Sequence, residues 1–235
     1  MSPVSDAQLG RLIGLLDLPP GARVLDLCCG KAEVLFRVLE AYPGATGVGV
    51  DRSPALLAEA RAEADRRGLA ERVSLREGDA WEEPVGEGFD AVLSLGGAYP
   101  NDDRRAFYAG LWAKAGAGGV VLVGDGFFVT PPDAGDLAAD GWTEEDIPRH
   151  GDHVALARTV GLHALYTTAA GPEAWDDYEG LYLRAIERWA RGHPDDPEAG
   201  AMVEFVRWWH GRYLDWRRDH LGFGLYLFQR GTAGV

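Results

Sequence analysis

The chain has 235 residues, of which 46% are hydrophobic and 26% are charged. This length can bury one substantial core and fits a single domain. The formal net charge of -14 argues against a nucleic-acid partner, because binding to phosphates depends on lysine and arginine. Small molecules remain as the expected partners, and the sequence leaves the oligomeric state open.

Cysteine usage and hydropathy indicate the compartment. The only two cysteines, Cys28 and Cys29, are adjacent, and this geometry does not favour a disulfide between them. No segment has about 18 consecutive apolar residues, and no basic start precedes an apolar run at the N-terminus. We therefore expect a cytoplasmic protein without a membrane partner.

Helices and strands alternate through the first half of the chain. The apolar periodicity predicts strands that are apolar on both faces, which is typical of a parallel sheet covered by helices on two sides. The predicted helices span residues 5–16, 54–67 and 102–115, with another directly after the first strand. The first predicted strand begins at residue 23. Four further strands are predicted over residues 46–51, 72–77, 89–95 and 119–124.

The second half has a different character. Residues 130–150 are rich in proline, glycine and acids and predict a loop or short-helix lid. A helix over 153–160 and a strand over 162–168 follow, and a last strand is expected over 223–230. The segment 172–220 predicts two aromatic-rich helices that form a cap. We interpret residues 1–235 as one domain with this lid and cap.

The stretch from Val24 to Val34 is an apolar run that stops at small residues and then becomes a helical pattern. Small side chains at Cys28, Gly30 and Ala32 allow a ligand to approach the backbone, while the N–H groups of the new helix face it. A dinucleotide motif would place Glu33 at its third glycine position, where a carboxylate opposes a pyrophosphate. A nucleotide-like cofactor without pyrophosphate fits better.

This segment resembles the first motif of class I S-adenosylmethionine-dependent methyltransferases. Asp26 and Gly30 match that motif, whereas Cys28 and Ala32 stand where it prefers glycine. The resemblance implies a Rossmann-like α/β fold with a seven-stranded sheet, mostly parallel with the last strand antiparallel. It also implies S-adenosyl-L-methionine as the cofactor.

The resemblance assigns cofactor contacts to the ends of the first four strands. Asp51, 21 residues after Gly30, is placed to accept hydrogen bonds from the ribose hydroxyls. Asp79 and Ala80 match the adenine-binding segment. The predicted cofactor residues are Asp26, Cys28, Gly30, Asp51, Arg52, Asp79, Ala80, Ser94 and Leu95, with no metal site.

Methyl transfer needs an in-line approach of the acceptor and removal of a proton. The Asn-Pro-Pro-Tyr sequence typical of enzymes that methylate amide or exocyclic amino groups is absent after the fourth strand, where the chain has Gly97-Ala98-Tyr99-Pro100. The candidates for assisting deprotonation are Tyr99, Asp125 and His153. A structural role is the alternative for the histidine.

Aromatic residues of the cap provide the candidate substrate contacts. Trp175, Tyr178 and Tyr182 recur at helical spacing and, with Tyr99, are predicted to bind the substrate, although packing in a core is an alternative. The segment from Trp175 to Gly180 also resembles uncharacterised bacterial members of the same family.

The sequence thus predicts methyl transfer to an oxygen or nitrogen of a small aromatic or apolar molecule. Two alternatives remain: an enzyme that keeps the cofactor but catalyses a cyclisation or elimination, and a non-enzymatic cofactor-binding interaction protein.

Overall fold

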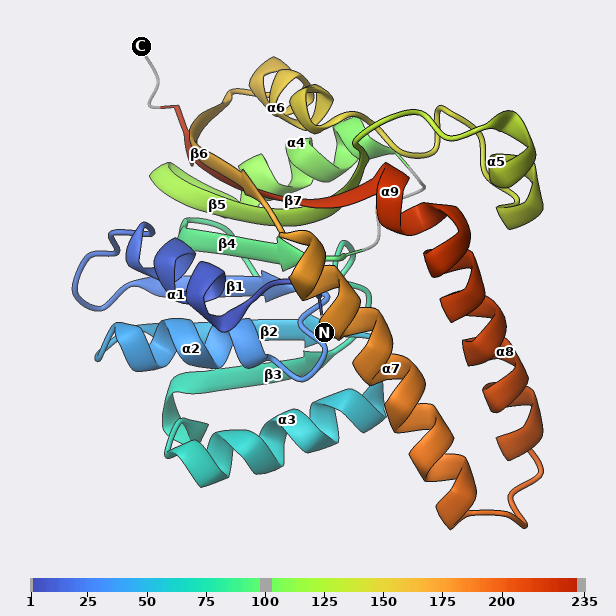
Figure 1. The fold of residues 1–235 in the computed structure, drawn as a ribbon. Helices are drawn as coiled ribbons and strands as arrows, with labels where there is room; N and C mark the ends of the chain where they lie inside the picture. Colours follow the sequence, from blue (N-terminus) through green and yellow to red (C-terminus); the bar gives the residue numbers. More distant parts are fainter. Residues whose placement is uncertain (1, 98–102, 232–235) are drawn as a thin grey trace. The chain divides into compact units, whose positions relative to one another are not determined.

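The computed structural model describes residues 2–97 and 103–231. A seven-stranded sheet with the order β3-β2-β1-β4-β5-β7-β6 organises them (Figure 1). The strands are β1 (Arg23–Leu27), β2 (Thr46–Asp51), β3 (Val73–Glu77), β4 (Phe89–Leu95), β5 (Ala115–Phe128), β6 (Leu162–Ala169) and β7 (Leu221–Arg230).

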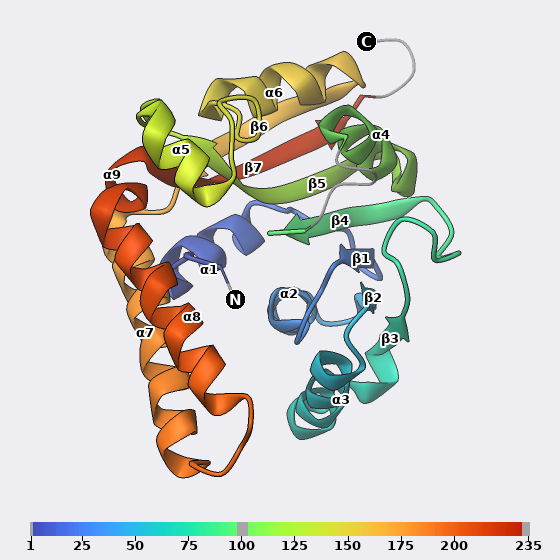
Figure 2. The same ribbon diagram turned by 90° about the vertical axis from the view of Figure 1, so that its right-hand side faces the viewer.

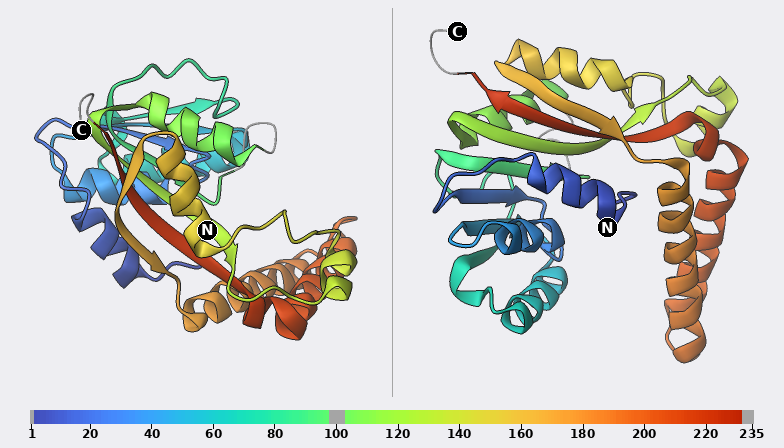
Figure 3. Two further views of the ribbon diagram at one scale, coloured as in Figure 1. Left: turned by 90° about the horizontal axis from the view of Figure 1, so that it is seen from above. Right: turned by 60° about the vertical axis from the view of Figure 1, so that its left-hand side comes forward.

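The direction of the strands confirms the fold class predicted from the sequence. β1 pairs in parallel with both β2 and β4, and β2–β3 and β4–β5 are parallel too. The last strand, β7, runs in the opposite direction (Figure 3). Along the sheet, the chain order of the strands runs outward in one direction from β1 to β3 and in the other direction from β4, so it reverses at β1. Open α/β sheets bind ligands outside the carboxyl ends of their strands at such a reversal.

The helices of the described chain complete the architecture. They are α1 (Asp6–Gly14), α2 (Glu33–Ala41), α3 (Pro54–Arg67), α4 (Arg104–Lys114), α5 (Ala134–Asp140), α6 (His150–Thr159), α7 (Pro172–Gly192), α8 (Ala199–Arg212) and α9 (Arg218–His220), with a 3-10 turn η1 (Ala70–Arg72) and a π-helical turn η3 (Tyr213–Arg217).

Two sets of helices cover the sheet. Helices α1, α2 and α3 lie along one face, and α4 and α6 along the other (Figures 1 and 2). Phe107 and Tyr108 of α4 and Ala157 of α6 share one buried core with Val92 of β4 and Tyr226 of β7. The predicted cover on both faces of the sheet is thereby confirmed.

Two glycines let α2 lie close against β2. A Cβ on Gly47 would stand 2.8 Å from Cδ1 of Leu35, and a Cβ on Gly49 would stand 2.9 Å from Sγ of Cys29. Side chains at these positions would push the helix and the preceding turn away from the sheet. The glycines of β2 thus help to place the turn between β1 and α2.

Capping residues set the bounds of α3 as the sequence predicts. Ser53 is extended and its Oγ accepts a hydrogen bond from the backbone N–H of Leu56, with Pro54 at the first helical position. Gly68, at φ 68°, ends the helix in the left-handed conformation. Ser53 and Pro54 thus start α3 directly after β2, and Gly68 ends it.

The predicted start of the fifth strand, residue 119, is wrong. β5 begins at Ala115, where it pairs with Phe89, and a bulge shifts the register before Ala91 meets Val120. A Cβ on Gly119 would stand 2.7 Å from the carbonyl oxygen of Phe89. The small residues over 115–119 resemble a loop in sequence, but they build this bulge.

The described chain divides into two compact units. Unit 1 comprises Met1–Ser5, Gly126–His150 and Ala169–Phe223, and unit 2 comprises Asp6–Asp125, Gly151–Thr168 and Gly224–Val235. The expected lid (130–150) and cap (172–220) both fall in unit 1, where α7 and α8 form an antiparallel hairpin (Figure 2). The single-domain organisation stays a prediction.

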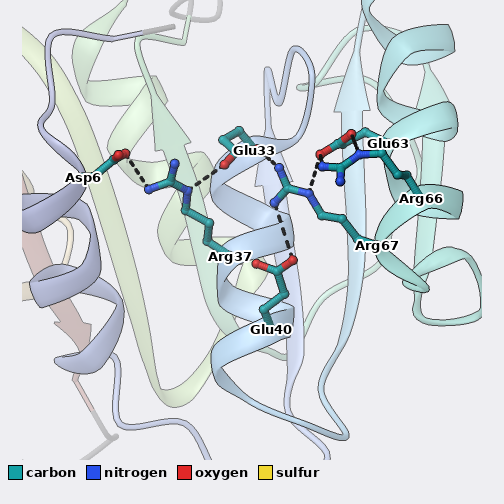
Figure 4. A network of polar contacts seen from close by, with 7 residues as sticks. All are labelled: Asp6, Glu33, Arg37, Glu40, Glu63, Arg66 and Arg67. Atoms are coloured by element: carbon teal, nitrogen blue, oxygen red, sulfur yellow. Dashed lines mark hydrogen bonds and ion pairs between the residues drawn. The ribbon is translucent and has the colours of Figure 1, made fainter.

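A chain of ion pairs links α1, α2 and α3 of unit 2 (Figure 4). Arg37 reaches Asp6 at 2.7 Å and Glu33 at 2.6 Å. Arg67 stands at the centre, because its guanidinium contacts Glu33, Glu40 and Glu63 while its side chain is only 16% exposed. The charge of Glu33 is thus paired, which weakens the electrostatic part of the argument against a pyrophosphate.

Removal of the central arginine should destabilise the fold. We expect Arg67→Ala to lower the free energy of unfolding by about 1 to 2 kcal/mol, because three carboxylates lose their shared partner. Urea unfolding at low salt measures this loss. Arg66→Ala is the matched control, since Arg66 is exposed and its one ion pair within the described residues is with Glu63. An equal loss in both variants would contradict a central role for Arg67.

Candidate cofactor and active site

The turn after β1 has a tightly wound backbone. Cys28, Gly30 and Ala32 have positive φ angles of 59°, 55° and 57°, a conformation that non-glycine residues rarely adopt. The N–H of Cys29 donates to the carbonyl of Val50 at 3.0 Å, which ties the turn to β2. The three small residues singled out in the sequence are therefore the three left-handed positions of this turn.

Asp51 joins the ends of β1 and β2. Its Oδ2 accepts a hydrogen bond from the N–H of Gly30 at 2.7 Å, and its Oδ1 accepts one from the N–H of Ser53 at 2.9 Å. Each carboxylate oxygen can accept a further hydrogen bond. The side chain is thus held in place by the backbone and keeps acceptor capacity for a ligand.

Asp26 is a buried acid one strand away from Asp51. It lies on β1 and is 4% exposed. Burial raises the pKa of Asp26 to about 8, with a further contribution from the nearby charge of Asp51. At neutral pH this carboxyl therefore keeps its proton in the cofactor-free protein, and a cationic ligand group beside it would favour the ionised form.

Asp79 and Arg52 form an ion pair. Asp79 also accepts a hydrogen bond through Oδ1 from the N–H of Trp81 at 2.8 Å. The guanidinium of Arg52 and this backbone contact hold the pKa of the Asp79 carboxyl below its usual range. Ala80, next in sequence, is buried. The structure thus links two residues that the sequence predicted separately.

The ends of β1 and β4 approach each other closely. A Cβ on Gly97 would stand 2.5 Å from Oγ of Ser94 and 3.5 Å from Cβ of Cys28. Ser94 is fully buried, and its Oγ has no hydrogen-bond partner among the described residues. Leu95 is half-buried beside it. A side chain at position 97 would therefore collide with Ser94.

A histidine and an acid meet at the carboxyl end of β5. Nδ1 of His153, on α6, stands 2.9 Å from the hydroxyl of Tyr108 and 4.0 Å from Oδ2 of Asp125. The His153 ring also packs on Tyr226, with centroids 4.9 Å apart. His153 is 1% exposed, whereas the side chain of Asp125 is 20% exposed. Of these two predicted catalytic residues, Asp125 is therefore the more accessible.

The predicted substrate residues of the cap lie on α7 in unit 1. Trp175 stacks on Tyr213, with centroids 6.3 Å apart, and meets the edge of Tyr178 at 6.1 Å. Tyr182 is half-buried. Their role in substrate binding stays a prediction. Tyr99, predicted for both catalysis and substrate binding, lies outside the described residues.

Sequence reasoning missed Tyr108 and Gly97. Tyr108 has the periodicity of an ordinary core residue on α4, and its histidine partner follows 45 positions later. Gly97 stands in a glycine-rich turn that gives no sign of the close contact with Ser94. Neither feature leaves a local sequence signal.

Comparison with known proteins agrees with this geometry. Residues 24–119 match the family model described as a methyltransferase domain. A methyltransferase from Geobacter sulfurreducens, crystallised with S-adenosyl-L-homocysteine, superposes with a TM-score of 0.88 at 26% identity, covering 97% of this chain and 92% of that one.

Residues 24–119 thus match a methyltransferase domain, and the chain has the fold of the class I S-adenosylmethionine-dependent methyltransferases. The uncharacterised protein YjhP of Escherichia coli is 26% identical over 96% of this chain and 91% of its own length. Erythromycin 3''-O-methyltransferase of Saccharopolyspora erythraea is 33% identical, over 57% of this chain and 42% of that protein. The cofactor expected from the sequence, S-adenosyl-L-methionine, is confirmed as that of the family.

Membrane-spanning helices and metal clusters are both absent from the described part of the chain. None of the helices there combines the length and apolar character needed to cross a membrane. The same residues bring together no group of three or more His, Cys, Asp or Glu side chains that could hold a metal ion.

The raised pKa of Asp26 predicts a pH-dependent cost to stability. The unfolded chain releases this proton near pH 4 and the folded protein only near pH 8. Between these values the folded state binds more protons, so Asp26 lowers stability as pH rises, by at most about 1.4 kcal/mol per pH unit. Asp26→Asn cannot ionise and should flatten this dependence.

Urea unfolding of the cofactor-free protein at pH 5, 6, 7 and 8 measures the effect. We expect the advantage of Asp26→Asn over the wild type to grow with pH. Asp65→Asn, an exposed change on α3, controls for the loss of one negative charge. A difference between Asp26→Asn and wild type that stays constant with pH would contradict the prediction.

Proposed function

We propose that the protein binds S-adenosyl-L-methionine in unit 2 and transfers its methyl group to an oxygen or nitrogen of a small aromatic or apolar molecule. The observation that carries the proposal is the Asp51 carboxylate at the end of β2, fixed by Gly30 and Ser53 next to the reversal of strand order at β1. A carboxylate with spare acceptor capacity at this edge fits a ribose.

The other residues of the site fit the remaining parts of the cofactor. Asp26 offers a carboxyl group to an ammonium, whose charge offsets the cost of ionising this buried acid. The Oγ of Ser94, which has no partner among the described residues, and the small residues Cys28 and Gly97 suit close approach of a ligand. Asp79 and Ala80 are proposed for the adenine, with Arg52 beside Asp79. When bound, the cofactor supplies an electrophilic methyl group on a sulfonium.

Asp125 is the proposed general base. Its partly exposed carboxylate can take the proton from an acceptor hydroxyl or amine as the new bond to the methyl carbon forms. His153 stands behind it, held by the hydroxyl of Tyr108 and the ring of Tyr226. Because His153 is almost fully buried, we propose that it positions Asp125 and does not touch the acceptor itself.

Similarity supports a small-molecule acceptor. The relative named erythromycin 3''-O-methyltransferase shares 33% identity with part of this chain. The acidic composition disfavours nucleic acids. The aromatic residues Trp175, Tyr178 and Tyr182 are proposed to contact an aromatic or apolar substrate.

Cofactor binding is tested by calorimetry with S-adenosyl-L-homocysteine. We expect Asp51→Ala to weaken binding by about 1 to 3 kcal/mol, because hydrogen bonds to a charged group are lost, and Asp51→Asn to have an intermediate effect. Glu77→Ala is the matched control, since Glu77 is exposed and stands beside Asp51 at the end of β3. Binding that is unchanged in Asp51→Ala would exclude the ribose contact.

Methyl transfer is tested with a panel of small phenols, alcohols, carboxylic acids and amines, by following S-adenosyl-L-homocysteine release and the mass of the product. With an acceptor found in this way, Asp125→Asn should lower kcat about 100-fold or more while leaving cofactor affinity intact. Tyr108→Phe keeps the ring and should cause a smaller loss. A converted substrate with the cofactor recovered unchanged would instead indicate the non-methylating enzyme.

A further inference from the structure

Four buried polar atoms on the α7–α8 hairpin and η3 have no hydrogen-bond partner among the described residues. They are Nε1 of Trp175, Nδ1 of His210, Nε1 of Trp216 and Nη1 of Arg217. All four residues belong to unit 1. Three of these atoms are obligate donors, and the histidine nitrogen donates in one tautomer or when charged. Buried polar groups in native proteins are almost always satisfied, so this concentration of donors calls for a missing acceptor.

Ring and polar contacts connect Trp175 and His210 between α7 and α8–η3, whereas Trp216 packs with Phe128, Leu137 and Trp142. Trp175 and Glu179 lie one turn apart on the same face of α7. Trp175 stacks on Tyr213, and Tyr213 lies 6.0 Å from the ring of His210. Nε1 of Trp209 donates to Glu179 at 2.8 Å. Aromatic and polar side chains therefore take part in joining the two helices.

Arg217 is the charged centre of the cluster. It is 3% exposed, and its guanidinium lies 4.1 Å from the ring centroid of Trp209. Nε and Nη2 both bind one oxygen of Asp140, whose side chain is fully buried, and Arg212 takes the other oxygen of that carboxylate. Both oxygens of Asp140 are thus engaged, while Nη1 of Arg217 keeps two unused N–H groups.

Glu179 does not supply the missing acceptor. This carboxyl is 2% exposed and accepts the Trp209 hydrogen bond, but it forms no ion pair with Arg217 within the described residues. Burial raises the pKa of Glu179, against smaller opposing effects of Trp209 and Arg217. A protonated Glu179 would add one more donor to the cluster.

We propose that unit 1 binds an aromatic carboxylate between α7 and α8–η3, with the carboxylate accepting hydrogen bonds from Trp175, His210 and Arg217. Ring stacking on Trp175 and Tyr213 favours an aromatic body, and charge-assisted bonds from a guanidinium favour a carboxylate. This inference rests on the proposed function and extends it by naming the chemical class of the small molecule.

The same cluster disfavours an amine ligand. Aromatic rings around a buried acid are typical of sites for organic cations. Here Arg217 already brings a positive charge to the rings of Trp142, Trp208, Trp209 and Trp216. A second cation would be repelled, and the unused N–H groups would stay unpaired.

Benzoate is the simplest probe that combines both features. In a proton–nitrogen correlation spectrum of the full chain, titration with benzoate should shift the indole N–H signals of Trp175 and Trp216. These signals are assigned with Trp175→Phe and Trp216→Phe. The signal of Trp112, which lies in unit 2 under Arg230, should stay in place. Benzylamine, with a cationic group in place of the carboxylate, should shift neither the Trp175 signal nor the Trp216 signal.

Trp175→Phe keeps an aromatic ring but removes the N–H group, and it should weaken benzoate binding roughly tenfold. Trp189→Phe is the matched control on the same helix, because Trp189 stacks on His193 away from the cluster; it should leave the affinity unchanged. The dispersion of each spectrum shows whether the variant is folded.

Three results would overturn the proposal: no shift with benzoate, an equal shift with benzylamine, or unchanged affinity in Trp175→Phe. Calorimetry with S-adenosyl-L-homocysteine on the same samples separates this proposal from the proposed function. Benzoate binding without cofactor binding would refute the methyltransferase function alone, and the reverse would refute the carboxylate site alone.

Discussion

The hydrogen bond from the N–H of Gly30 to Asp51 is the constraint on which the candidate cofactor site depends. It holds the left-handed turn of β1 against the end of β2, and the parallel register that pairs Leu27 with Val50 brings the two groups together. The glycines of β2 let the turn and α2 lie close enough for this bond to form. Small residues in the turn therefore serve two purposes, because they permit its backbone conformation and leave room for a ligand.

The same edge of the sheet carries an electrostatic cost. Asp26 and Asp51 are neighbouring acids, and burial makes the ionised form of Asp26 unfavourable. A residue that served the fold alone would be better replaced by an apolar or amide side chain. A cationic ligand group changes this balance, because it stabilises the charge that the cofactor-free protein disfavours. Strain of this kind concentrates at functional sites, and it points to a role for Asp26 that packing does not explain.

Local patterns predicted the parts of the structure that local physics determines. β2 and β4 have the predicted bounds 46–51 and 89–95, because alternating apolar and turn residues define such strands. The acid at the end of β2, Asp51, was singled out by its distance to Gly30, and its role in cofactor binding stays a prediction. The contacts of His153 with Tyr108 and Asp125 were not, since they join α6 to α4 and β5 through packing across many residues. The β5 bulge was missed because its glycines match a loop equally well.

The function of the aromatic cap could not be predicted from residue spacing either. The helical spacing of Trp175 and Tyr178 reveals a face, but spacing alone does not distinguish a packed seam from a binding surface. The structure adds which polar groups form hydrogen bonds. Asp176 accepts from Tyr213 and Arg218, and Glu179 accepts from Trp209. In a seam that only packs, polar groups either pair in this way or are replaced by apolar ones. Nε1 of Trp175, Nδ1 of His210 and Nη1 of Arg217 do neither among the described residues, so packing alone does not explain why the cluster is polar.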